Sequence, residues 1–160
     1  MLNNKAQQLV AIQLVLFAAL GISLLVFPSE QSLPLRVFGL LIAALGGVVG
    51  LVAIQQHPGG PNVTPTPKDT SPLLQSGIYG QIRHPIYTGV ILGGLGLAMF
   101  HGHIVPLLAA FVLVPFFTYK SLYEESLLKQ AYPDYAAYMT RTGRFTPPLQ
   151  QQQDTNSDNE

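Results

Sequence analysis

Apolar residues gather in four long runs, which are separated by short polar or proline-containing segments. The runs cover residues 6–27, 35–55, 85–100 and 104–123. The first holds no charge over about 22 positions, and a helix needs roughly 20 apolar residues to cross a bilayer. We therefore predict an all-α fold, an integral membrane bundle of four transmembrane helices with a C-terminal helical segment.

A signal peptide is the competing interpretation of the first run. Its apolar core would be about 7–15 residues long and would precede a cleavage site of small residues. The first run is longer, and the sequence LLVFPSE at its end has no such site. We expect an uncleaved span. In the second run, the sequence AALGGVVG supplies small residues that let helices approach closely.

The third run is short for a straight span. Pro85 suits the first turn of a helix, where its missing N–H costs nothing. The helix is therefore expected to begin at His84 or Pro85, which puts Arg83 and His84 at the membrane interface. Only the sequence HGH separates this run from the fourth, so the two should form a tight hairpin. Its histidines, His101 and His103, have no carboxylate nearby in sequence, and we expect solvated turn residues and no metal site.

Composition supports the membrane assignment. The chain is 48% hydrophobic and 10% charged, whereas soluble domains carry about 25% charged residues. Its formal net charge is +0 and it has no cysteine. We therefore predict no nucleic-acid partner, no disulfide scaffold and no thiolate metal site.

The placement of Lys and Arg predicts the orientation, because cytoplasmic loops are rich in both. With four spans, a single side would hold all but one of these residues, and Arg36 is the exception. That side also holds both termini, which we therefore predict to be cytoplasmic. Its basic residues are Lys5, Lys68, Arg83, Lys120, Lys129, Arg141 and Arg144.

Two polar regions share this side. Residues 56–76 are too rich in Pro and Gly for a helix. Beyond the fourth run, Lys120–Glu124 and Glu125–Lys129 have the i, i+4 spacing of ordinary surface ion pairs. Tyr135 and Tyr138 should share one face of a short helix. We predict a single domain over residues 1–148 and a disordered polar tail over residues 149–160.

The polar residues at this interface form a recognisable pattern. The sequence GIYGQIRHPIYTG is followed, after the hairpin, by a Glu-Glu pair and by Tyr-x-x-Tyr before a basic segment. This arrangement resembles the isoprenylcysteine carboxyl methyltransferase family, and related patterns occur in membrane phospholipid methyltransferases. The matching positions are Gly77, Tyr79, Arg83, His84, Pro85, Tyr87, Gly89, Glu124, Glu125, Tyr135 and Tyr138.

The resemblance implies S-adenosylmethionine as cofactor, bound at the cytoplasmic ends of the last helices. It implies Arg83 and His84 as catalytic residues, and Lys120 on the acceptor side, where the family usually has Arg. Glu124 would pair with the cofactor ammonium, and tyrosine rings would face its sulfonium. The implied cofactor-binding residues are Leu73, Leu74, Tyr79, His84, Pro85, Ile86, Tyr87, Glu124 and Glu125.

The acceptor stays open between two chemistries. A prenylcysteine carboxylate is already ionised and needs no general base, whereas a lipid amine must lose a proton, for which His84 is the nearby candidate. In both cases the partner is a lipid or lipidated molecule reached from the membrane. A non-catalytic membrane protein that retains the fold is a further alternative. The sequence carries no signal for an oligomeric state.

Overall fold

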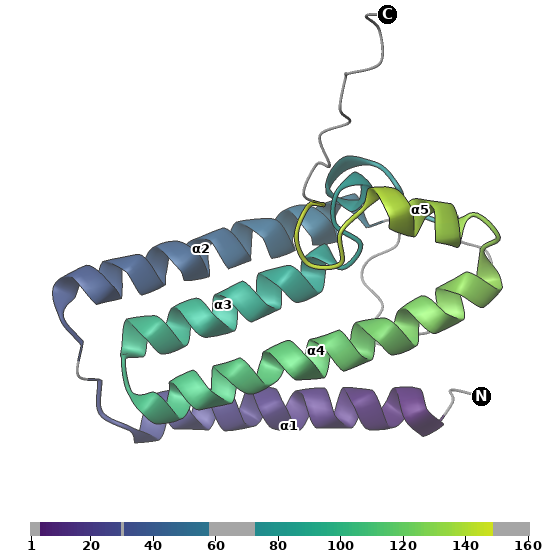
Figure 1. Cartoon of the computed structure of the whole chain (residues 1–160). Helices are drawn as coiled ribbons and strands as arrows, with labels where there is room; N and C mark the ends of the chain where they lie inside the picture. The colour runs from purple at the N-terminus through teal and green to yellow at the C-terminus, as the bar shows by residue number, and fades with distance from the viewer. Residues whose placement is uncertain (1–3, 30, 58–72, 149–160) are drawn as a thin grey trace, which may run out of the picture.

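The computed structural model describes residues 4–29, 31–57 and 73–148. Within these residues the chain is helical (Figure 1), and the only strand-like pairing is a single bridge between Ile82 and Gly143. Two predicted segments lie outside the described residues: the loop over residues 56–76, except for residues 56–57 and 73–76, and the tail over residues 149–160. Lys68 belongs to the first of these. The elements are α1 (Asn4–Val26), α2 (Leu33–Gln56), the short 3-10 helix η1 (Gly77–Gly80), α3 (Pro85–His101), α4 (Ile104–Ala131) and α5 (Tyr135–Arg141).

Three of these helices, α1, α2 and α4, are long and apolar enough to cross a membrane. The fourth apolar helix, α3, has 17 residues, which at roughly 1.5 Å per residue makes it about 5 Å shorter than a hydrocarbon core of roughly 30 Å. Large apolar side chains point away from the bundle, among them Leu25 at 87% and Leu33 at 74% exposure. Outward apolar faces on long helices are what a lipid surrounding requires.

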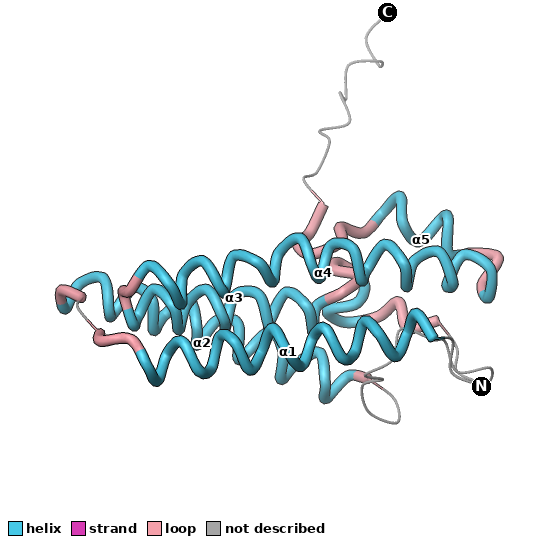
Figure 2. Tube along the Cα trace, turned by 90° about the horizontal axis from the view of Figure 1, so that it is seen from below, coloured by secondary structure: helices cyan, strands magenta, loops and turns pink. Residues whose placement is uncertain are grey.

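The four long helices run side by side, with α2 against α3, α3 against α4, and α4 against α1 (Figures 1 and 2). The α2–α3 contact is the most extensive one and is made through glycine. A Cβ atom on Gly46 would lie 2.5 Å from the Gly93 nitrogen, and one on Gly89 would lie 2.7 Å from the Gly50 nitrogen. Real Cβ atoms do not approach backbone that closely, so the two backbones touch only because these side chains are absent.

The apolar core lies on the other side of α3, between α1, α3 and α4. Its buried members come from all three helices: Leu20, Ile91, Ala98, Ala110, Leu113 and Phe117. Phe117 is 1% exposed and its ring lies 4.8 Å from that of Tyr87. This core therefore reaches the start of α3, where the polar motif begins.

At the opposite end of the bundle, the α3–α4 turn is tied to the end of α1. Gly102 has a φ of 86°, a left-handed conformation that ends α3 and turns the chain sharply into α4. The His101 ring nitrogen lies 3.0 Å from the Phe27 carbonyl, and His103 stacks on Phe27 at 4.7 Å. The expectation of solvated turn histidines is therefore wrong for His101, which is 8% exposed.

Candidate functional site

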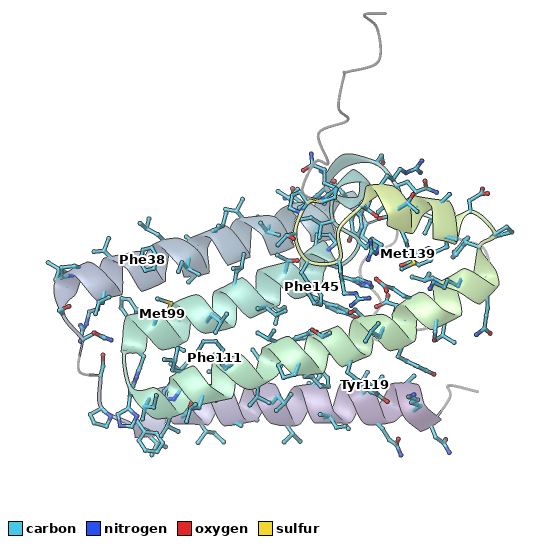
Figure 3. The ribbon with its side chains drawn as sticks, in the orientation of Figure 1. Phe38, Met99, Phe111, Tyr119, Met139 and Phe145 are labelled. Atoms are coloured by element: carbon cyan, nitrogen blue, oxygen red, sulfur yellow. The ribbon has the colours of Figure 1, made fainter. Side chains whose placement is uncertain are left out.

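The motif at the start of α3 is held by a segment from the far end of the chain, residues 142–145, which we call the C-terminal strap. Its pairing with the motif is parallel: Arg83 N–H donates to the Gly143 carbonyl at 2.8 Å, and His84 N–H to the Arg144 carbonyl at 3.0 Å. The Thr88 hydroxyl adds a bond to the Phe145 carbonyl at 2.8 Å. In Figure 3, Phe145 and Met139 mark this end, whereas Phe38 and Phe111 lie further from it.

Glu125, two residues beyond the fourth apolar run, is the centre of the charged cluster. Its carboxylate accepts from Arg83 Nε at 3.0 Å, from Arg144 Nη2 at 2.8 Å and from His84 Nε2 at 3.3 Å. Its side chain is 3% exposed. The Glu125–Lys129 surface pair that the spacing suggests is therefore not what holds this residue, because its carboxylate points inward to the two guanidinium groups.

Burial and hydrogen bonding act in opposite directions on Glu125. Burial alone would raise its pKa, but hydrogen bonds from His84, Arg144 and Arg83 outweigh burial and hold the pKa well below its usual range. The same interaction raises the pKa of Arg144. Glu125 is therefore an anion at neutral pH, with cations on two sides.

The Arg83 side chain is turned into the protein. Besides Glu125, its Nη1 donates to the carbonyls of Met139, at 3.2 Å, and of Thr142. The side chain is 8% exposed. These contacts join the start of α3 to α4, α5 and the strap. Arg83 therefore holds these four segments together.

His84 lies between two carboxylates. Its Nε2 faces Glu125, and its Nδ1 lies 3.6 Å from Glu124 Oε2. The ring stacks on Tyr87 at 5.4 Å with an interplanar angle of 4°, and Phe145 meets it edge-on at 6.3 Å. Because Glu125 is ionised, the neutral ring would donate from Nε2–H, which leaves the Nδ1 lone pair toward Glu124.

Glu124 is the more open of the two acids, with 27% of its side chain exposed. It accepts a hydrogen bond from the Tyr87 hydroxyl at 2.9 Å. A carboxylate has about four lone-pair sites, so Glu124 keeps capacity for a further donor.

Lys120 lies one turn earlier on α4 and is 1% exposed, so the expected surface position of the Lys120–Glu124 pair is wrong. Its ammonium donates to Gln13 of α1 at 2.5 Å. It also lies 5.3 Å from the centroid of the Tyr87 ring. Lys120 is therefore part of the interior of the bundle, directly behind the motif.

Tyr79 and Tyr138 connect the segments that surround the charged cluster. The Tyr79 hydroxyl donates to the Ala53 carbonyl at 3.2 Å, and the Tyr138 hydroxyl donates to the Tyr79 carbonyl at 2.5 Å. Burial, the largest cause in each case, raises the pKa of both phenols to about 12. Tyr79 thus ties η1 to α2, and Tyr138 ties α5 to η1.

The structure brings together Arg83, His84, Tyr87, Glu124 and Glu125. Pro85 is fully buried at the first turn of α3, whereas Leu73, Leu74 and Ile86 are half-buried at the same end. Tyr79 lies behind the cluster, with its hydroxyl turned to α2. In the part of the chain that the structure describes, no three His, Asp or Glu side chains are arranged to hold a metal ion.

Sequence reasoning missed several residues of this site. The sequence analysis counted Arg144 only among the basic residues of one side of the membrane. It treated Gln13 as part of an apolar run, and it did not single out Thr142 or Phe145. The basic segment after Tyr-x-x-Tyr was the available signal for Arg144. No sequence signal pointed to Gln13, because its partner is 107 residues away.

An all-helical bundle in which three helices are long and apolar enough to cross a membrane is consistent with an integral membrane protein. A cluster of polar residues lies at one end of its helices. The sequence pattern of the phospholipid methyltransferase family matches residues 35–135 of the chain. The chain therefore belongs to this family, within the isoprenylcysteine carboxyl methyltransferase-like group of membrane methyltransferases, which confirms the resemblance seen in the motif. A comparison with curated proteins gives no match.

Proposed function

We propose that this protein transfers a methyl group from S-adenosylmethionine to a lipid-borne acceptor at the motif end of the bundle. The observation that carries the proposal is the pair formed by Glu124 and Tyr87, a part-exposed carboxylate hydrogen-bonded to a tyrosine whose ring stacks on His84. An acid with spare acceptor capacity beside aromatic rings is suited to a cationic ligand.

The residues present fit that cofactor. S-adenosylmethionine carries an ammonium and a sulfonium, and when bound it supplies an electrophilic methyl group. Glu124 would take the ammonium, while Tyr87 and His84 would offer ring faces to a cation. Three half-buried residues at the same end, Leu73, Leu74 and Ile86, would supply apolar contacts to the cofactor. Two buried residues, Tyr79 and Pro85, would hold the backbone around them.

Glu125 and Arg83 would act by positioning. With Glu125 held as an anion by Arg83 and Arg144, His84 keeps its proton on Nε2 and presents Nδ1 as a base. A lipid ammonium would lose one proton to Nδ1 before its nitrogen is methylated. A carboxylate acceptor needs no such step, so the same site is compatible with both.

Two acceptors are therefore proposed for the test, the carboxylate of a prenylated cysteine and the amine of a phospholipid headgroup. The family description favours the phospholipid, and the motif favours the prenylcysteine equally. Lys120, buried beneath Tyr87, would face the acceptor in either case.

We also propose that α3 completes a four-span bundle, with the site and both termini on the cytoplasmic side. In support, α3 lies between α2 and α4 and runs alongside both. Among the described residues, Arg83, Lys129, Arg141 and Arg144 lie at the motif end, and Arg36 lies at the other.

The test uses full-length protein purified in detergent, with S-adenosylmethionine carrying a labelled methyl group. Phosphatidylethanolamine and N-acetyl-S-farnesylcysteine are offered separately, and the products are identified by mass spectrometry. We expect donor binding and a labelled product from one of the two. Glu124→Gln should weaken donor binding by about tenfold or more, because it removes a charge-assisted hydrogen bond.

Asp134 provides the matched control, because it is an exposed acid just before α5, near the same end of the bundle. Asp134→Asn removes the same charge as Glu124→Gln and should leave donor binding unchanged. Absence of donor binding in the unaltered protein would leave the non-catalytic alternative. Equal donor binding by the two variants would refute the role of Glu124.

A further inference from the structure

Arg144 of the C-terminal strap contacts both the backbone of His84 and the acid that faces its ring. The Arg144 carbonyl accepts the His84 backbone N–H at 3.0 Å, and the Arg144 guanidinium binds Glu125. We infer that Arg144 is a positioning residue for His84: by occupying Glu125 it limits the pull of that carboxylate on the imidazole, so that the ring can serve as a base. The inference rests on the proposed function for the role of His84, and it extends the site to the strap.

The first step is how the Glu125 carboxylate is divided among its donors. Arg144 reaches both oxygens, with Nε 3.2 Å from Oε1 and Nη2 2.8 Å from Oε2. Arg83 and His84 meet at Oε1, at 3.0 and 3.3 Å. The contact from His84 is therefore the longest of these four, and the shortest belongs to Arg144.

The second step is the effect of this division on the imidazole. A carboxylate beside a histidine favours the protonated ring, and a cation beside it disfavours that form. Loss of the Arg144 guanidinium would leave Arg83 and His84 as the donors to Glu125, so the ring would hold a proton more tightly. A protonated ring has no free lone pair, and it cannot take a proton from a lipid ammonium.

The third step is the choice between the two arginines on Glu125. Arg83 is 8% exposed and is also bonded to two backbone carbonyls, whereas Arg144 is 27% exposed. Replacing Arg144 therefore changes the charge on Glu125 while the buried contacts of Arg83 remain. The other charged and titratable groups of the cluster, which stay unaltered in the comparison, are Glu124, Tyr87, Lys120 and Tyr135.

The experiment compares Arg144→Gln and Arg144→Lys with Arg141→Gln, which removes the same charge from an exposed arginine that donates to Gln75. Full-length protein with isotope-labelled histidine is purified in detergent, and NMR follows the imidazole nitrogens between about pH 5 and about pH 9. The chain has four histidines, so the spectrum of His84→Gln assigns the His84 signals. Methyl transfer to phosphatidylethanolamine and to N-acetyl-S-farnesylcysteine is measured over the same pH range.

In Arg144→Gln we expect the His84 signals to change from the protonated to the neutral form about one pH unit higher than in the unaltered protein. The rise of kcat with pH on phosphatidylethanolamine should move with them, because that amine must give a proton to the ring. The profile on the farnesylcysteine should stay in place, since a carboxylate needs no base. Arg144→Lys should show a smaller shift, because it keeps the charge and loses the planar fork. Arg141→Gln should match the unaltered protein.

The inference is overturned if His84 titrates alike in Arg144→Gln and Arg141→Gln. It is also overturned if the kcat profile on methylated phosphatidylethanolamine stays in place, or if the profiles on both acceptors move equally. The NMR measurement needs neither donor nor acceptor, so a shifted titration without methyl transfer would refute the proposed function and keep the effect of Arg144 on His84. Should Arg144→Gln fail to fold, Arg144→Lys decides by a shift in the same direction, and no shift overturns the inference.

Discussion

Glu124 and Glu125 are neighbours in sequence with opposite surroundings. Consecutive helical residues point about 100° apart, and this rotation turns Glu125 into the protein while Glu124 stays 27% exposed. Glu125 is bonded by Arg83, His84 and Arg144, whereas Glu124 has Tyr87 as its hydroxyl donor. This contrast supports the proposal that Glu125 holds the cluster together and that Glu124 binds the donor.

Glu125 should make the fold sensitive to acid. Its folded pKa lies below the ordinary value of 4.5, so its contribution to stability is fully present above that pH. As the pH falls further, the unfolded chain takes up a proton that the folded chain resists, and stability is lost. Melting temperatures in detergent between about pH 7 and about pH 3 should therefore drop steeply.

The Glu125→Gln variant isolates this effect. At neutral pH it should be less stable by about 3 kcal/mol, because buried Arg83 loses its charged partner. Its melting temperature should then depend less on acid than that of the unaltered protein. Parallel pH curves for the two proteins would mean that other groups cause the acid loss.

The sequence pointed to His84 and to the acidic pair because each lies in a short pattern of neighbouring residues that can be recognised locally. It did not point to the strap. Residues 142–145 reach the motif through parallel backbone bonds to residues 81–84, and such pairing leaves no periodic trace in the sequence. The partners of Glu125 could thus be named only once the chain was folded.

At the scale of elements, the α2–α3 pair depends on absent side chains. Gly46 and Gly89 bring the two backbones into contact, whereas Gly47, one position along, has nothing within 4 Å of its Cβ direction. The sequence AALGGVVG predicted close approach by some helix. It did not say which glycine would face the partner, because neighbouring small residues look alike in sequence.

Gly46→Ala and Gly47→Ala form a matched pair. The first should lower stability by about 1–3 kcal/mol, since its methyl group would force the helices apart. The second should be neutral or raise stability by up to about 1 kcal/mol, because alanine favours the helix over glycine. Unfolding in detergent measures both, and similar losses in the two variants would contradict the packing.

The apolar runs predicted the helices well because membrane spans depend on length and composition alone. Which helices pack against each other could not be predicted from the sequence. Consecutive helices α1 and α2 do not form a major contact, and α1 lies against α4 instead. Long apolar helices expose similar faces, so the choice of neighbour depends on details such as the α2–α3 glycines.

For the whole molecule, the uneven placement of charge connects fold to orientation. In the described chain, the end of the bundle that meets α5 carries most of the basic residues, and the other end has Arg36. The Arg36 side chain donates to Ser29 and lies 5.9 Å from the Phe100 ring. Since cytoplasmic ends are richer in Lys and Arg, the motif end should face the cytoplasm. Its basic residues are Lys5, Arg83, Lys120, Lys129, Arg141 and Arg144.

Single cysteines test this orientation cleanly, because the chain has none of its own. Ser32 is exposed at the Arg36 end and makes no side-chain cap bond, and Ala136 is exposed on α5. In intact cells that express the protein, a membrane-impermeant maleimide should label Ser32→Cys at once and Ala136→Cys only after permeabilisation. Both should react equally in detergent, which controls for accessibility. Labelling of both residues in intact cells would contradict the four-span topology. Labelling of Ala136→Cys alone would show that the orientation is the reverse of the predicted one.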